Sequence, residues 1–94
     1  MKGRRFSDEE LRLVRNQVSI KLVLEEVCGK ECKEIEGQIR FVCPVCNEMQ
    51  SSIHPRENLG RCFRCSRNFN PIELVMVGCK LSFVDSVKLL RGYL

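Results

Sequence analysis

Four cysteines in two pairs are the side chains of this sequence best suited to chemistry. The first pair lies in the run CPVC, the second lies in the run CFRC, and fifteen residues separate them. Each C-x-x-C pair turns tightly and the segment between the pairs is long enough to return, so four thiolates can converge on one ion. An all-sulfur tetrahedron suits zinc or an iron–sulfur cluster, and we predict Zn²⁺. The predicted ligands are Cys43, Cys46, Cys62 and Cys65.

A zinc ion held in this way is expected to be structural. Four protein ligands fill the tetrahedron and leave no position for a water molecule that the metal could activate. Elsewhere the sequence shows neither paired carboxylates for a two-metal polymerase site nor a glycine loop that binds phosphates. We therefore expect a protein that is not an enzyme, in which metal binding contributes to folding.

The other three cysteines and the single histidine show no second paired spacing. Free cysteine packs well as a small hydrophobe, so Cys28, Cys32 and Cys79 are interpreted as buried or incidental thiols, with a second site as the open alternative. A ligand-exchange role stays open for His54, although four cysteines already fill the tetrahedron. An odd number of cysteines, four of them in ligand spacing, favours a reducing compartment over a secreted disulfide framework.

Composition and charge predict one folded domain over residues 1–94. The chain is 44% hydrophobic and 30% charged, as in folded proteins rather than disordered tails, and it is small enough for a metal to assist its core. Neither a signal peptide nor an apolar run of membrane-spanning length is present, so we expect a cytoplasmic protein with no membrane partner. The formal net charge of +4 permits a nucleic-acid partner without requiring one.

Helical patterns precede the first cysteine pair. Ser7 and Glu10 have the spacing of a capping box, which predicts the start of a helix. Ser19 is expected to cap a second helical stretch that ends at Gly29, either a separate helix or the second half of one bent helix. The apolar residues with helical spacing are Leu11, Val14 and Val18 in the first stretch and Ile20, Val23, Leu24 and Val27 in the second.

Strand patterns surround the two cysteine pairs. After a polar segment at residues 30–36, apolar and polar residues alternate from 35 to 42, which predicts a half-buried strand that leads into Cys43. Residues 51–54 are predicted to form a short strand, and residues 55–60 a turn before the strand that carries Cys62. These segments predict a small antiparallel zinc-ribbon sheet.

Two helices are expected after the second cysteine pair. Asn70 and Pro71 have the types of an N-cap and a first helical residue, and Gly78 is placed to stop that helix. Ser82 is expected to cap the last helix, which should pack on the sheet or on the preceding helix. The predicted buried residues are Ile72, Val75 and Met76 in the first helix and Phe83, Val87 and Leu90 in the second. The fold class is therefore α+β, a zinc ribbon flanked by N-terminal and C-terminal helices.

Several short runs carry a family resemblance over residues 19–90. They are CPVCNE at 43–48, SSI at 51–53, CFRC at 62–65, PIELVM at 71–76 and LSFVDSVKLL at 81–90, after the helix and loop of residues 20–37. In these runs the chain resembles the zinc-binding domain of bacterial DnaG-type DNA primases and of related phage primase–helicases. That family has Cys-Pro-x-His with Asn-Glu, a Pro-Ser-Phe strand, Cys-Phe-x-Cys and two similar helices.

The chain departs from this family pattern at three places. Cys46 stands where the family usually has histidine, and either residue ligates zinc. Residues 66–70 replace a glycine-rich turn. The polymerising domain that follows in primases, with its acidic metal-binding residues, is not among these 94 residues.

The resemblance implies that the zinc ribbon contacts a single-stranded template. Basic and aromatic residues around the cysteine pairs fit that function, because arginines attract phosphates and an aromatic ring stacks on bases. The candidate residues are Arg40, Phe41, Arg61, Phe63, Arg64 and Arg67. The alternative also stays open that these arginines neutralise the thiolates and that the two phenylalanines cover the metal or the core.

Two functions are therefore weighed. The first is a non-catalytic, zinc-dependent nucleic-acid-binding module that resembles the template-recognising domain of primase, with single-stranded DNA as the ligand and a role in DNA replication or on a mobile element. The second is a zinc-stabilised adaptor that binds a replication or mobile-element protein such as a primase or helicase. A salt-dependent complex with single strands favours the first, and capture of a protein partner without such a complex favours the second.

Overall fold

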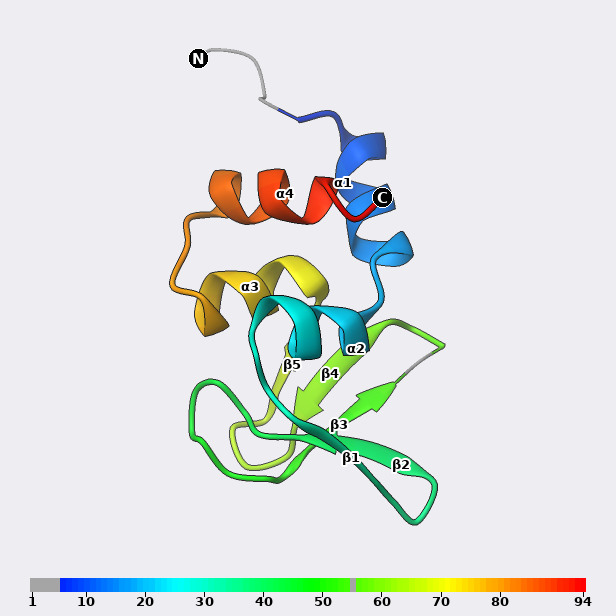
Figure 1. Ribbon diagram of the computed structural model, residues 1–94, viewed down its shortest axis with the longest axis vertical. Coiled ribbons are helices and arrows are strands. Elements are labelled where there is room, and N and C mark those ends of the chain that lie inside the picture. Colours follow the sequence, from blue (N-terminus) through cyan, green and yellow to red (C-terminus); the bar gives the residue numbers. More distant parts are fainter. Residues whose placement is uncertain (1–5, 55) are drawn as a thin grey trace.

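The helices of this protein lie over one face of an antiparallel sheet, as Figure 1 shows for the computed structural model. The structure describes residues 6–54 and 56–94, so the basic segment 1–5 and Pro55 of the predicted turn lie outside the described residues. The elements are α1 (Asp8–Gln17), α2 (Ile20–Leu22), the π-helical η1 (Val23–Val27), β1 (Cys32–Ile35), β2 (Gln38–Phe41), β3 (Ser51–His54), β4 (Leu59–Cys62), β5 (Arg67–Phe69), α3 (Pro71–Gly78) and α4 (Phe83–Arg91). The predicted α+β class, with helices from both ends of the chain flanking the sheet, is confirmed.

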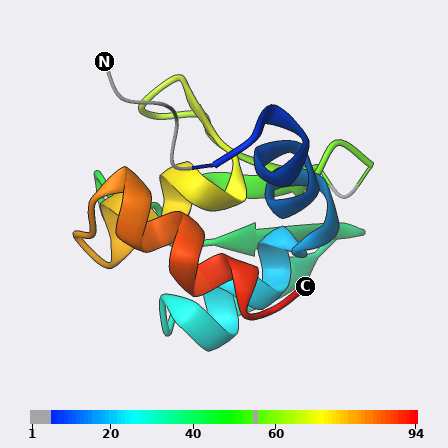
Figure 2. The same cartoon turned by 90° about the horizontal axis from the view of Figure 1, so that it is seen from above.

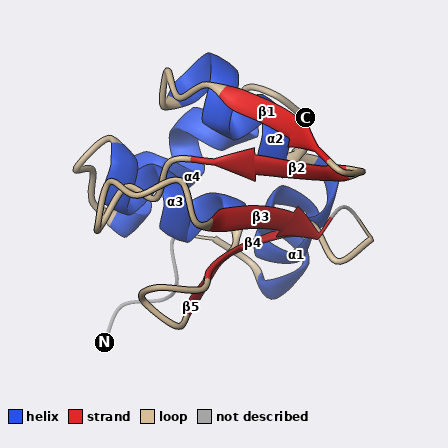
Figure 3. Ribbon diagram, turned by 90° about the horizontal axis from the view of Figure 1, so that it is seen from below, coloured by secondary structure: helices blue, strands red, loops and turns tan. Residues whose placement is uncertain are grey.

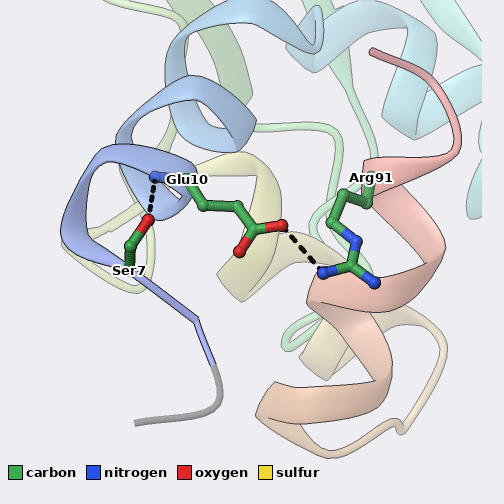
Figure 4. A network of polar contacts seen from close by, with 3 residues as sticks. All are labelled: Ser7, Glu10 and Arg91. Carbon is green, nitrogen blue, oxygen red and sulfur yellow. Dashed lines mark hydrogen bonds and ion pairs between the residues drawn. The ribbon is translucent and has the colours of Figure 1, made fainter.

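Ser7 begins α1 as predicted, because its Oγ accepts a hydrogen bond from the Glu10 amide at 3.0 Å. The second half of the predicted capping box is wrong. The Glu10 carboxylate does not turn back to the cap but accepts from Arg91 at 2.8 Å (Figure 4). Arg91 also stacks over the ring of Phe6, with 5.4 Å between the guanidinium carbon and the ring centroid. The Glu10 side chain therefore joins the first helix to the last.

The first two helical stretches are separate helices. Val18 and Ser19 have extended backbone, and Ser19 caps α2 by accepting from the Leu22 amide at 3.4 Å. The helix continues as η1, whose last bond runs from the Cys28 amide to the Val23 carbonyl at 2.9 Å. Gly29 follows with φ +66°, the left-handed conformation predicted for it.

The sheet has the strand order β1-β2-β3-β4-β5, and every neighbouring pair is antiparallel. The prediction of one strand over residues 35–42 is wrong at its start. Ile35 ends β1, and Glu36 and Gly37, with φ values of 51° and 80°, form a two-residue turn into β2. Such a turn suits the twist of a hairpin because both central residues have positive φ. The strand β5 was also not predicted.

The core lies between the sheet and the helices. Its largest fully buried side chains are Val14, Val18, Ile20, Val23, Leu24, Phe41, Phe69, Pro71, Leu74, Val75, Val87 and Leu90. Most predicted apolar stripes are therefore confirmed, but Met76 is only partly buried and Phe83 is 42% exposed, with its ring edge-on to that of Phe6 at 6.4 Å between centroids. In the view from above in Figure 2, α4 packs on α3 and α1, and Figure 1 shows that it lies one layer away from the sheet.

Gly78 ends α3 as predicted but does not adopt the left-handed conformation of a helix stop. The residue with positive φ is Lys80, two positions later. Space is tight at position 78, because a Cβ there would lie 3.0 Å from the Cys28 sulfur, which would have to give by a few tenths of an ångström. The asparagine cap of α3 is confirmed, and Glu73 completes a reciprocal capping box with Asn70 at 2.8 and 3.0 Å.

Candidate metal centre

The four predicted ligands lie together at one end of the sheet. Their sulfur atoms all lie within 4.8 Å of one another, with 3.9 Å between Cys43 and Cys65 and 3.6 Å between Cys46 and Cys62. A tetrahedron with metal–sulfur bonds of about 2.3 Å, the length for zinc, has edges of about 3.8 Å. The four cysteines are therefore positioned to bind one tetrahedral metal ion, as the spacing predicts.

Strand ends position the first cysteine of each pair. Cys43 follows β2 after one residue and Cys62 ends β4, and both side chains are fully buried. The next turn then brings back the second cysteine. In each turn a backbone amide points at the first sulfur at 3.3 Å, from Val45 to Cys43 and from Cys65 to Cys62. These amides stabilise negative charge on sulfur.

The residues that follow the two pairs bend the chain away from the metal. Asn47 and Ser66, each directly after the second cysteine of its pair, have φ values of 61° and 55°. The Phe63 amide donates to the Gln50 carbonyl at 3.0 Å and so joins the two loops. The two loops therefore have the same backbone features, an amide that donates to the first sulfur and a positive φ after the second cysteine, although they share few residue types.

The surroundings of the cluster act differently on the pKa values of Cys62, Cys65 and Cys46. Burial opposes ionisation of Cys62, but hydrogen bonds from the Cys65 amide and the neighbouring thiols lower its pKa to about 6. Burial and the neighbouring thiols raise the pKa of Cys65 to about 12, and burial raises the pKa of Cys46. Protonated neighbouring thiols thus stabilise the thiolate of Cys62, and binding of a dication releases the protons of those neighbours.

His54 and the other cysteines lie away from this centre. Ser51 pairs with Cys62 across the sheet, whereas His54 pairs with Leu59 at the far end of β3, about 10 Å along the strand. Cys32 begins β1, while Cys28 and Cys79 belong to the helical layer. Within residues 6–54 and 56–94, the four predicted ligands form the single group of three or more side chains that could hold a metal ion.

A row of polar and basic residues crosses the sheet beside the metal centre. Arg40 pairs with Ser52, Ser52 with Arg61, and the row continues to Lys33 on β1 and Asn68 on β5. Side chains alternate along strands, and the next residues in each strand, among them the buried Phe41, Ile53 and Phe69, face the helices. The row therefore lies on the opposite face, which no helix among the described residues covers (Figure 3). We call Lys33, Arg40, Ser52, Arg61 and Asn68 the basic row.

Three of the predicted nucleic-acid residues gather on or beside this face. The Arg61 guanidinium lies 5.8 Å from the centroid of the Phe63 ring and donates to Asn68 Oδ1 at 3.1 Å. Phe63 is 58% exposed, the largest value among the exposed large hydrophobic side chains. Arg40 is half-buried and donates to the side chain of Gln38 at 3.2 Å.

The other three predicted residues lie elsewhere. Phe41 is fully buried against Gly60, where a Cβ would come within 2.8 Å of its ring, so it belongs to the core and not to an exposed surface. Arg67 pairs with Cys62 and stacks over the buried ring of Phe69 at 4.9 Å, which places it on the other side of β5 from Asn68. Arg64 is exposed in the second cysteine loop.

The sequence pattern did not reveal Lys33, Ser52 and Asn68 as members of the row. Their alignment depends on strand register, and the signal that could have revealed it is the Glu36-Gly37 turn, which fixes how β1 pairs with β2. With that hairpin recognised, Lys33 falls opposite Arg40.

Comparison of the chain with protein-family models and with curated proteins finds no match. The resemblance to primase zinc domains therefore stays a prediction. Within the described part of the chain, no helix combines the length and apolar character needed to cross a membrane.

Proposed function

We propose that this chain is a non-catalytic, zinc-dependent nucleic-acid-binding module, and that single-stranded DNA binds across the uncovered face of its sheet. The observation that carries the proposal is the basic row with the exposed Phe63 ring at its side. The order of motifs that resembles primase zinc domains supports the same ligand class and a role in replication or on a mobile element.

Zinc is the metal that fits this proposal. Four thiolates in a tetrahedron with 3.6 and 3.9 Å edges match zinc–sulfur bond lengths. The ion would join the two cysteine loops and so hold Phe63, which lies between Cys62 and Cys65, beside the end of β4. With four protein ligands the ion has no open position, so its role here is structural.

The basic row supplies the phosphate contacts in this proposal. Neighbouring strands lie about 4.8 Å apart, so Arg40 and Arg61, separated by β3, are about 10 Å apart across the sheet. The small side chain of Ser52 lies between them. A single strand that runs from β1 toward β5 would meet Lys33, Arg40 and Arg61 in turn and then reach the Phe63 ring for base stacking.

Fluorescence anisotropy with labelled single-stranded DNA tests this proposal. Phe63→Ala should weaken binding about tenfold or more at fixed salt, since stacking on an aromatic ring contributes about 1–3 kcal/mol per base. Arg61→Glu should weaken binding further and flatten its salt dependence, because fewer counterions are released. Matched controls are Phe83→Ala and Lys88→Glu, which remove a phenylalanine ring and reverse one positive charge at exposed positions of the helical layer and should bind like wild type.

Each variant must first show zinc loading equal to that of wild type. Binding to RNA and to duplex DNA, measured in the same way, assigns the strand and sugar preference. Absence of any complex at low salt, or equal binding by the sheet variants and their controls, rejects the nucleic-acid proposal. A protein-binding adaptor is then the better description.

A further inference from the structure

Two thiols outside the metal centre meet in the helical layer. Cys28 is the C-cap of η1 and Cys79 is the C-cap of α3, and these two helices pack together, with η1 continuing from α2 below α3 in Figure 1. Each thiol donates to a carbonyl of the other helix. Cys28 Sγ donates to the Leu74 carbonyl at 3.8 Å, and Cys79 Sγ donates to the Val27 carbonyl at 3.6 Å. The reciprocal bonds place both sulfur atoms on one seam.

The backbone of α3 approaches Cys28 unusually closely at this seam. Gly78 directly precedes Cys79, and a Cβ on it would lie 3.0 Å from the Cys28 sulfur and 3.6 Å from the Cys28 Cβ. A disulfide requires Cα atoms only about 4.4–6.8 Å apart, so close approach of the two backbones is the condition that matters most.

We propose that Cys28 and Cys79 form a second, metal-independent thiol site that closes to a disulfide when a small-molecule disulfide oxidises it. The Cys79 thiolate attacks one sulfur of the oxidant R–S–S–R, which forms a mixed disulfide and releases one thiolate. Cys28 then loses its proton and attacks the Cys79 sulfur, which forms the protein disulfide and releases the second thiolate. Two S–H bonds and the oxidant's S–S bond are broken, one S–S bond is formed in the protein, and the oxidant is reduced to two R–SH molecules.

The surroundings of the two thiols assign the order of these steps. Burial, with the nearby Cys79 thiol, raises the pKa of Cys28 to about 12, so Cys28 keeps its proton in the reduced protein. A thiol of this kind is a poor first nucleophile but is already in place to resolve a mixed disulfide on its neighbour. In a reducing glutathione pool the pair stays as two thiols. The disulfide forms only when the ratio of oxidised to reduced glutathione rises.

Closure would tie the ends of η1 and α3 around the ribbon. The segment between Cys28 and Cys79 contains all five strands and the four metal-binding cysteines. A covalent link across so long a loop restricts the unfolded chain strongly, so the oxidised protein should resist heating more than the reduced one.

The test is a peptide map of the wild-type chain loaded with zinc and equilibrated with oxidised and reduced glutathione at increasing ratios. Free thiols are alkylated, the protein is digested, and zinc is measured on the same sample. The expected result is one crosslinked peptide pair that joins Cys28 to Cys79, with zinc retained and Cys32 still alkylated. The melting temperature should rise by about 5 °C or more on closure.

Two variants sharpen this result. Cys79→Ser should abolish the crosslink and the rise in melting temperature, whereas the matched control Cys32→Ser should retain both. The map on wild type decides the question even if a variant folds poorly. Alkylation of Cys28 and Cys79 as fast as Cys32 at every ratio overturns the proposal, and so does a crosslink of either residue to any other cysteine or to a second chain.

Discussion

The backbone around the metal-binding cysteines already favours thiolates before an ion is bound. The amides of Val45 and Cys65 point at sulfur atoms at 3.3 Å, and hydrogen bonds lower the pKa of Cys62 to about 6 in spite of its burial. Zinc ligands must be deprotonated, so this arrangement assists metal binding.

The spacing of the cysteines alone predicts the ligands, because a C-x-x-C turn is a local structure. Burial of Phe41 could not be predicted in this way, since it depends on the approach of Gly60 from β4.

One zinc per chain is expected, and replacement of a ligand should remove it. Cys62→Ser takes away the fully buried ligand at the end of β4 and leaves three sulfurs, so zinc should fall far below one equivalent by elemental analysis. The variant should also melt at a lower temperature, because structural zinc contributes on the order of 10–16 kcal/mol in finger peptides. Cys32→Ser, outside the centre, serves as the control and should keep its zinc. Equal zinc content and melting in both variants would contradict the assignment.

Ser66 is the residue at which the second cysteine loop departs most from its local preference. A non-glycine residue at φ 55° costs roughly 1–2 kcal/mol, and serine has less affinity for this conformation than the asparagine at position 47. Ser66→Gly should therefore raise the free energy of unfolding by about 1 kcal/mol, or the melting temperature by about 4–8 °C. Asn68→Gly in the neighbouring strand should act in the opposite direction, because its backbone lies in β5 and has no positive φ. Denaturant titration of both variants measures the two signs.

At the scale of elements, one side chain of the sheet holds the junction of the first two helices. Asn58, in the turn between β3 and β4, accepts from the Ile20 amide at 2.8 Å and donates to the carbonyls of Arg15 and Val18 at 2.7 and 2.8 Å. Its side chain thus supplies hydrogen-bond partners both for carbonyls at the end of α1 and for an amide at the start of α2. Its φ of 54° is tolerated because asparagine adopts the left-handed conformation more readily than most residues.

Asn58→Asp should destabilise the protein although the two side chains have the same shape. The carboxylate keeps the acceptor for Ile20 but turns the donating group into an oxygen that faces two carbonyls. Loss of these bonds should cost about 2 kcal/mol or more, which lowers the melting temperature by about 8–16 °C. The carbonyls raise the folded-state pKa of the new carboxyl group, so the deficit should shrink as pH falls toward about 4, where a protonated group can donate again. Asn68→Asp, which keeps its acceptor for Arg61, should melt near wild type at both pH values.

The elements could be predicted where local signals decide them. Caps at Ser7, Ser19, Asn70 and Ser82, the antiparallel ribbon and the left-handed Gly29 follow from residue type and position. The strand β1 was missed because the polar run that contains it has no alternation, and only its pairing with β2 makes it a strand. The ion pair of Glu10 with Arg91 was missed for a similar reason, since it joins opposite ends of the chain.

The whole molecule has two centres of stability, which predicts an uneven response to metal removal. The helices bury apolar side chains against Phe41, Ile53 and Phe69, whereas the two cysteine loops are joined to each other by the Phe63–Gln50 backbone bond and by the cysteine cluster. Removal of zinc should therefore loosen the loops more than the helices, because the helices bury many apolar side chains besides the two ligands, Cys43 and Cys62, that belong to the core.

Hydrogen exchange after complete chelation measures this difference directly. Amides in the loops, such as those of Asn47, Phe63 and Cys65, should lose their protection, while interior amides of α1, α3 and α4 should keep most of theirs. Restoration of the loop protection by added zinc is the control for irreversible damage. Unchanged protection throughout residues 40–67 would mean that the ion does not hold the loops, and equal loss in every helix would mean that the ribbon and the helices unfold as one unit. The expected pattern lies between these two outcomes because the sheet belongs to both centres: its strand ends carry the cysteines, and its inner face carries the core.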